Sequence, residues 1–65
     1  MPVKPSDIEK LIQTSGFSAD YEFFFNDGTI KYDFDSATAS REIAERLSNL
    51  NANYMKAGKT IIIQF

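Results

Sequence analysis

The residues of this chain with the most recognisable chemical pattern are Gly58, Lys59 and Thr60, which have the form that ends a phosphate-binding loop. Such a loop needs an earlier glycine at fixed spacing and a following helix whose N-terminus holds the phosphates. Here Asn53 stands at the first glycine position, and the apolar, β-branched run Ile61–Ile63 follows in place of a helix. We therefore expect a turn or a helix C-cap at Gly58 and no nucleotide site.

Carboxylates suggest two further chemistries. Asp33 and Asp35 have the spacing that opens a calcium loop, but Thr38 stands where glycine is needed and Ala44 where the bidentate ligand belongs. Glu22 and Asp33 would act as a catalytic carboxylate pair only in a deep cleft, for which a small domain leaves little room. A loose divalent-ion or basic-partner site is the alternative, and it would also use Asp20 and Asp35. We predict no defined metal centre and no cofactor.

Composition argues against most other catalysts. The chain has no cysteine and no histidine, which removes thiolate nucleophiles, disulfides, the usual zinc ligands and the commonest general base. No serine is followed three positions later by a lysine. We therefore expect a protein that is not an enzyme.

The length and composition indicate one compact domain over residues 1–65. With 65 residues, 43% of them hydrophobic and 14% aromatic, the chain is near the lower size limit for a core without metal or disulfides. No segment approaches the roughly 18 consecutive apolar residues of a membrane span. The expectation is a soluble, cytoplasmic protein that does not bind membranes.

Two helices are expected. Ser6 and Glu9 have the spacing of a capping box, which predicts a helix over Asp7–Ser15 that ends at Gly16. A second helix would be capped by Asp35 or Ser36 and carries an apolar stripe made of Ala39, Ile43, Leu47 and Leu50. Its end is expected near Leu50 or Asn51, with a continuation to Ala57 as the alternative.

Between the helices, the segment YEFFFNDGTIKYDF predicts a β-hairpin. Asp27 and Gly28 lie between two apolar runs and favour a two-residue type I′ turn. That turn would pair Phe24 with Lys31, Phe25 with Ile30, Phe23 with Tyr32, Glu22 with Asp33 and Tyr21 with Phe34. One face then carries only apolar or aromatic side chains, namely Tyr21, Phe23, Phe25, Ile30, Tyr32 and Phe34. A three-residue loop would mix the two faces.

The run from Thr60 to Phe65 is the last predicted strand, and we expect it beside the second hairpin strand and parallel to it, after a right-handed crossover through the second helix. The fold class is therefore α+β, a small αββαβ two-layer sandwich with a three-stranded sheet and both helices on one face. Residues 53–56 are a candidate for a short fourth strand.

The sheet face opposite the helices is the candidate site. Phe24 and Ile62 should point out of this face, where apolar side chains commonly mark an association surface. The hairpin region adds the acidic residues Asp20, Glu22, Asp27, Asp33 and Asp35 beside Lys31.

Phe24 and Ile62 are compatible with scattered exposed apolar residues, with cover by the N-terminal arm at Val3, or with one of three occupants. The first interpretation is a noncatalytic regulatory or accessory protein that binds a basic or mixed protein partner, one form of which is an inhibitor of a nucleic-acid-binding protein. Self-association as a homodimer is a second use of the same face. The third is a module that binds single-stranded nucleic acid on the sheet with the help of Lys31, Arg41, Arg46, Lys56 and Lys59.

Overall fold

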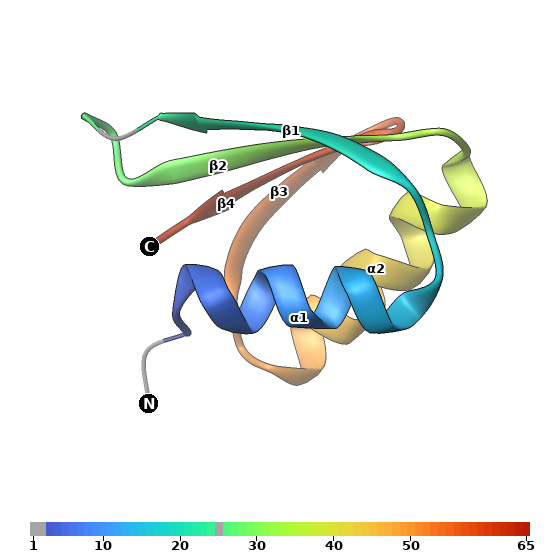
Figure 1. Cartoon of the computed structure of the whole chain (residues 1–65), viewed down its shortest axis with the longest axis horizontal. Helices are drawn as coiled ribbons and strands as arrows, with labels where there is room; N and C mark the ends of the chain where they lie inside the picture. The colour runs from blue at the N-terminus through green and yellow to red at the C-terminus, as the bar shows by residue number, and fades with distance from the viewer. Residues whose placement is uncertain (1–2, 25) are drawn as a thin grey trace.

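The computed structural model describes residues 3–24 and 26–65, and it shows two helices packed on one face of a four-stranded sheet (Figure 1). In chain order, the elements are α1 (Pro5–Ser15), β1 (Ala19–Phe24), β2 (Thr29–Phe34), α2 (Ala37–Asn49), β3 (Asn53–Ala57) and β4 (Thr60–Gln64). The expected α+β architecture is confirmed. The candidate strand at 53–56 is a full member of the sheet, so the order of elements is αββαββ.

The strands are arranged in the order β1-β2-β4-β3, and every neighbouring pair is antiparallel. The prediction that the last strand runs parallel to the second hairpin strand was therefore wrong. The chain leaves α2 into β3, which runs in the same direction as β2, and β4 then turns back into the space between them. The crossover through α2 thus connects β2 to β3, and β4 is the inserted strand of a split βαβ unit.

The Gly58-Lys59-Thr60 motif forms the tight turn between β3 and β4. Ala57 pairs with Thr60 across a two-residue loop, and Gly58 has φ +61°, as the first residue of a type II′ turn requires. The carbonyl oxygen of Gly58 accepts a hydrogen bond of 2.9 Å from the hydroxyl of Ser40, a fully buried residue of α2. Of the two roles expected for Gly58, the structure shows the turn.

Helix α1 begins earlier than expected. Its N-cap is Lys4, whose backbone N–H donates to the carboxylate of Asp7 at 3.1 Å, so the predicted capping box of Ser6 and Glu9 is wrong. Pro5 follows the cap, where the missing N–H of proline costs no helical hydrogen bond. The predicted end is confirmed, because Gly16 takes the left-handed conformation with φ +82°.

Helix α2 agrees with its expected boundaries. The Ser36 hydroxyl accepts from the Ala39 N–H at 3.1 Å, and the helix ends at Asn49 with Leu50 as its C-cap. Leu50 completes the predicted stripe in sequence but is 43% exposed, because the helix has ended. In the part of the chain that is described, neither helix is long and apolar enough to cross a membrane.

The hairpin has the expected faces but not the expected register. Phe24 pairs with Thr29, Glu22 with Lys31 and Tyr21 with Tyr32, so the pairing is shifted by two residues and the loop is longer. Asp27 does not have positive φ, and its N–H donates to the Phe24 carbonyl at 3.3 Å. Among the described turn residues 26–28, only Gly28 has positive φ, at +64°. The type I′ turn was therefore wrong. The expected place of Phe25 lies outside the described residues.

The physical reason for this error is the two-residue period of a strand. A shift by one residue moves every side chain to the other face, whereas a shift by two leaves each face unchanged. Apolar alternation therefore excludes a three-residue loop and cannot separate a two-residue loop from a four-residue one. Charge favours the observed alignment, since Glu22 is opposite Lys31 in place of Asp33.

The core lies between the sheet and the two helices. Its buried apolar side chains come from both helices and from β2 and β4, and they are Ile8, Ile12, Ile30, Tyr32, Phe34, Ala39, Ile43, Ala44, Leu47, Ile61 and Ile63. Tyr21 was expected among them and is 69% exposed. It points to the helix side from β1, at the edge of the sheet, where helical cover is incomplete.

The Gly28 turn gives a direct test of the hairpin. Gly28→Val should lower the free energy of unfolding by about 1–2 kcal/mol, because a β-branched residue resists positive φ. Space is not the cause, since an added Cβ would lie 3.5 Å from the Phe65 carbonyl oxygen, an ordinary contact. Gly28→Asn is the control, because asparagine tolerates this conformation. Equal stability of the valine variant and the wild type in urea unfolding would contradict the turn.

Candidate functional site: the open face of the sheet

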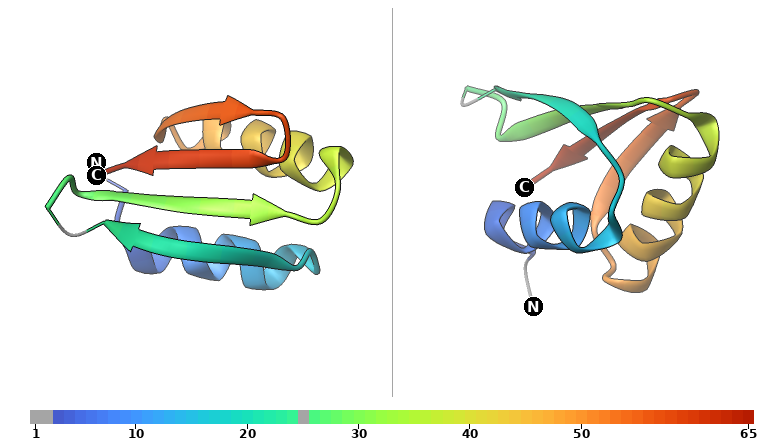
Figure 2. Two further views of the ribbon diagram at one scale, coloured as in Figure 1. Left: turned by 90° about the horizontal axis from the view of Figure 1, so that it is seen from above. Right: turned by 45° about the vertical axis from the view of Figure 1, so that its right-hand side comes forward.

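Figure 2 shows both helices on one side of the sheet, which leaves the other face open. By the strand register, that face carries three rows of side chains across the strands. In the order β1, β2, β4, β3, the rows follow from the strand register and are Asp20-Asp33-Thr60-Ala57, Glu22-Lys31-Ile62-Met55 and Phe24-Thr29-Gln64-Asn53. The expectation that Phe24 and Ile62 share this face is confirmed. We call these three rows the open face.

Phe24 and Ile62 line the same shallow depression. It has a volume of about 590 Å³ and is bounded also by Asp27, Lys31 and two polar residues of β2 and β4, Thr29 and Gln64. Phe24 is 37% exposed and Ile62 is 39% exposed, so each is anchored in the sheet and still presents apolar surface to a partner. The depression is wide and open, which suits a protein side chain or segment better than an enclosed small molecule.

Charge is concentrated on the β1–β2 half of the open face. Glu22 lies directly across from Lys31, and Asp20 lies directly across from Asp33. The like-charge pair predicted at Glu22 and Asp33 is therefore wrong, and the repulsion falls instead on Asp20 and Asp33. The hydroxyl of Thr60 relieves part of it by donating to the Asp33 carboxylate at 2.6 Å.

Two residues change the predicted membership of this site. Asp35 follows β2 on the way to α2, and it belongs neither to the three rows nor to the depression. Met55 was not predicted; it lies beside Ile62 on β3 and is 70% exposed. Side-chain alternation along a strand at residues 53–57 would place Met55 on this face, but the sequence only suggested that strand and did not give its pairing with β4.

The basic residues considered for nucleic-acid binding are not gathered on this face. Lys31 lies on it, whereas Arg41 and Arg46 are exposed on α2, in the helical layer. Lys56 pairs with the core residue Ile61 and so points to the helix side, and Lys59 is in the β3–β4 turn. In residues 3–24 and 26–65, no group of three or more acidic or other ligand side chains is placed to hold a metal ion.

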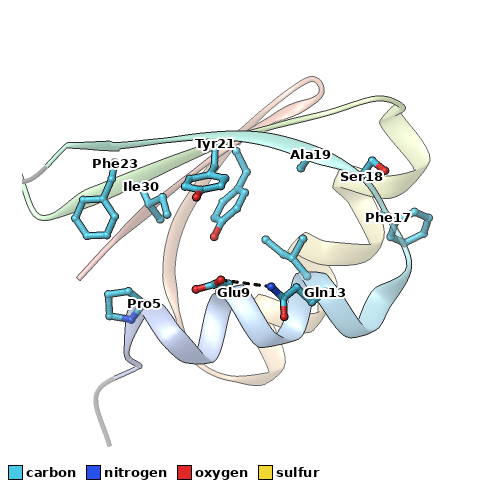
Figure 3. Close-up of a pocket in the computed structure, with 11 residues that line it drawn as sticks. Pro5, Glu9, Gln13, Phe17, Ser18, Ala19, Tyr21, Phe23 and Ile30 are labelled. Carbon is cyan, nitrogen blue, oxygen red and sulfur yellow. Dashed lines mark hydrogen bonds between the residues drawn. The ribbon is translucent and has the colours of Figure 1, made fainter.

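A second hollow lies on the other side of the sheet, between α1 and the β1–β2 hairpin (Figure 3). Tyr32 projects into it from β2, and its ring centroid is 5.9 Å from that of Tyr21. Burial raises the pKa of the Tyr32 phenol, and the nearby carboxylate of Glu9 and phenol of Tyr21 raise it further. The phenol is therefore kept protonated and can act as a hydrogen-bond donor.

Comparison with protein-family models, curated proteins and solved structures finds no match to this chain. The residues of the open face are therefore the basis for assigning a function.

The raised pKa of Tyr32 predicts how stability depends on pH. As pH rises through about 10, the unfolded chain releases this proton while the folded protein retains it, so the free energy of unfolding falls. Urea unfolding measured from about pH 9 to about pH 11 should show this loss. In Tyr32→Phe, the free energy of unfolding should fall less steeply with pH, because the contribution of the Tyr32 phenol is removed. Tyr54→Phe is the matched control. A Tyr32→Phe slope equal to that of the wild type would contradict the shift.

Proposed function

We propose that this protein is a noncatalytic binding module that docks a basic protein segment on its open face. The single observation that carries the proposal is the joint lining of one depression by Phe24 and Ile62, on a face that also holds three carboxylates. The protein would act as a regulatory or accessory factor.

The apolar part of the proposal rests on Phe24, Ile62 and Met55. These side chains face away from the helices and are exposed, and Ile62 and Met55 are direct cross-strand neighbours. Aromatic residues that a partner can desolvate supply most of the binding energy at protein interfaces, while their surroundings mainly exclude water. Phe24 is the expected anchor, since it lines the depression and is the one aromatic side chain in the three rows.

The charged part of the proposal selects the partner. The open face carries Asp20, Glu22 and Asp33 against one cation, Lys31. A partner rich in lysine or arginine would be steered toward this face and matched by it. Two copies of this chain placed face to face would bring carboxylates together, which disfavours the homodimer.

A partner whose basic surface binds nucleic acid would fit the same face, and the protein would then act as an inhibitor by competing for that surface. Direct binding of single-stranded nucleic acid is the second candidate. It has in its favour one exposed aromatic residue beside Lys31, but the neighbouring carboxylates oppose a phosphate backbone.

The test uses a displayed random peptide library selected against the immobilised protein. Enriched peptides should combine an apolar residue with flanking lysine or arginine. Their affinities, measured by calorimetry, should fall at least about tenfold in Phe24→Ser, the loss expected for an interface anchor. Asp20→Asn with Asp33→Asn should weaken binding less and should reduce its dependence on salt.

Leu50→Ser is the matched control, since it removes an apolar residue of similar exposure from the C-cap of α2. Peptide affinities that are equal in Phe24→Ser and Leu50→Ser would contradict the proposal. Tight binding of oligonucleotides that weakens steeply with added salt would favour the nucleic-acid alternative. A dimer in sedimentation that Phe24→Ser dissociates would identify a second copy as the occupant.

A further inference from the structure

The hollow between α1 and the β1–β2 hairpin has the size of a small-molecule site. Its volume is about 480 Å³, and pockets that enclose small ligands commonly have roughly 300–1,000 Å³. Figure 3 shows two opposed walls: Tyr21 and Phe23 point from the sheet toward α1, while Pro5 and Glu9 point from α1 toward the sheet. This cavity lies on the side of the sheet opposite to the open face and does not depend on the function proposed for that face.

The cavity lies where α1 faces the edge strand β1, whose helix-side residues are less buried than those of β2. Ile8 and Ile12 of α1 are buried in the core, whereas Tyr21 on β1 remains 69% exposed and Phe23 is half-buried. Side chains of β1 that point to the helix side therefore form a wall of a cavity and do not interdigitate fully with the helix. Ile30 and Tyr32 on the neighbouring strand close its inner end.

Apolar and polar groups have separate places in the lining. Ile12, Phe17, Phe23 and Ile30 supply an apolar surface suited to a ring or a short hydrocarbon. The polar groups are the carboxylate of Glu9, the amide of Gln13 and the phenols of Tyr21 and Tyr32. Gln13 donates from its side-chain nitrogen to Glu9 at 3.3 Å, which orients that carboxylate from within the helix.

Charge identifies the kind of ligand. Glu9 is the one ionisable group of full charge in the lining, and none of the described residues that line the cavity is basic. A bound anion would meet this carboxylate without a compensating cation, whereas a bound cation would be paired. The two tyrosine rings, with centroids 5.9 Å apart, add the negative ring faces that attract cations.

The phenols contribute without taking on charge themselves. Burial and the nearby Glu9 carboxylate both keep the Tyr32 pKa raised, so its hydroxyl stays neutral and able to donate or accept a hydrogen bond. Within residues 3–24 and 26–65, neither the Tyr21 nor the Tyr32 hydroxyl has a side-chain or backbone partner, so both are free to bind a ligand.

We propose that this cavity binds a small organic cation with an apolar body, of the class of arylalkylamines, in which a protonated amine is joined to an aromatic ring by a short alkyl chain. The ammonium group pairs with Glu9 and lies near the Tyr21 and Tyr32 rings. The apolar body packs against Phe23, Ile30 and Ile12. Binding involves no covalent step.

The test compares three probes of nearly equal shape that differ in charge: 2-phenylethylamine, 2-phenylethanol and 3-phenylpropionate. Each is titrated into the isotopically labelled full chain, and backbone amide shifts are followed by NMR. The amine should give saturable shifts in α1 and β1, centred on Glu9, Gln13, Tyr21 and Phe23. Its dissociation constant should be at least about tenfold lower than that of the carboxylate, the size of one charge-assisted hydrogen bond.

Glu9→Gln should weaken the amine about tenfold and make it bind no better than the alcohol, with the amide spectrum outside α1 unchanged. Glu9 is exposed, so this change should leave the fold intact. Glu45→Gln, at an exposed position of α2 outside the cavity, is the matched control. Unaltered amine affinity in Glu9→Gln, no saturable shift in the wild type, or equal affinity for the carboxylate would overturn the proposal.

The two proposed sites can fail separately. Phe24→Ser changes the open face and should leave the amine titration unchanged, because Phe24 does not line the cavity. Loss of amine binding in Phe24→Ser would show that the shifts do not report this cavity, and would overturn its assignment.

Discussion

The packing of isoleucine and leucine side chains between the two central strands and the helices is the constraint on which this small fold depends. Ile61 on β4, Ile43 and Leu47 on α2 and Ile8 on α1 are all fully buried, and they come from three elements of the chain. Within residues 3–24 and 26–65, the two helices form one such layer, and no helix or strand covers the second face of the sheet. Strand alternation then requires every second side chain to face water.

The helical layer is itself uneven, and this unevenness produces the cavity. α2 lies against β2, β3 and β4, and it ties the β3–β4 turn to the core through the buried hydroxyl of Ser40. α1 is left to cover the β1 side of the sheet, and it does so with the short apolar stripe of Ile8, Leu11 and Ile12. Cover is therefore complete over the central strands and incomplete at the β1 edge, where Tyr21 is exposed.

Local sequence patterns correctly predicted the features that depend on residues close together in the chain. They gave wrong predictions for features that depend on contacts between distant segments. The Ser36 cap, the end of α2 near Leu50 and the faces of the described hairpin residues follow from short-range chemistry, and all were correct. The hairpin register depends on the length of the loop. Side-chain alternation cannot distinguish two registers that differ by two residues, because both give the same faces. The direction of the last strand depended on whether residues 53–57 pair with it, a contact that their own composition only suggested.

The candidate sites, too, were predictable only in part. Phe24 and Ile62 were assigned to the open face because side chains alternate along a strand. This assignment is the same whether the hairpin has a two-residue or a four-residue loop. The cavity could not be foreseen, because it depends on the separation of α1 from β1 and no local pattern encodes that distance. One strand nevertheless contributes to both proposed sites: on β1, Asp20, Glu22 and Phe24 face outward, while Tyr21 and Phe23 line the cavity. The pleat of that strand keeps the two surfaces chemically separate, so substitutions at alternate positions act on one surface at a time.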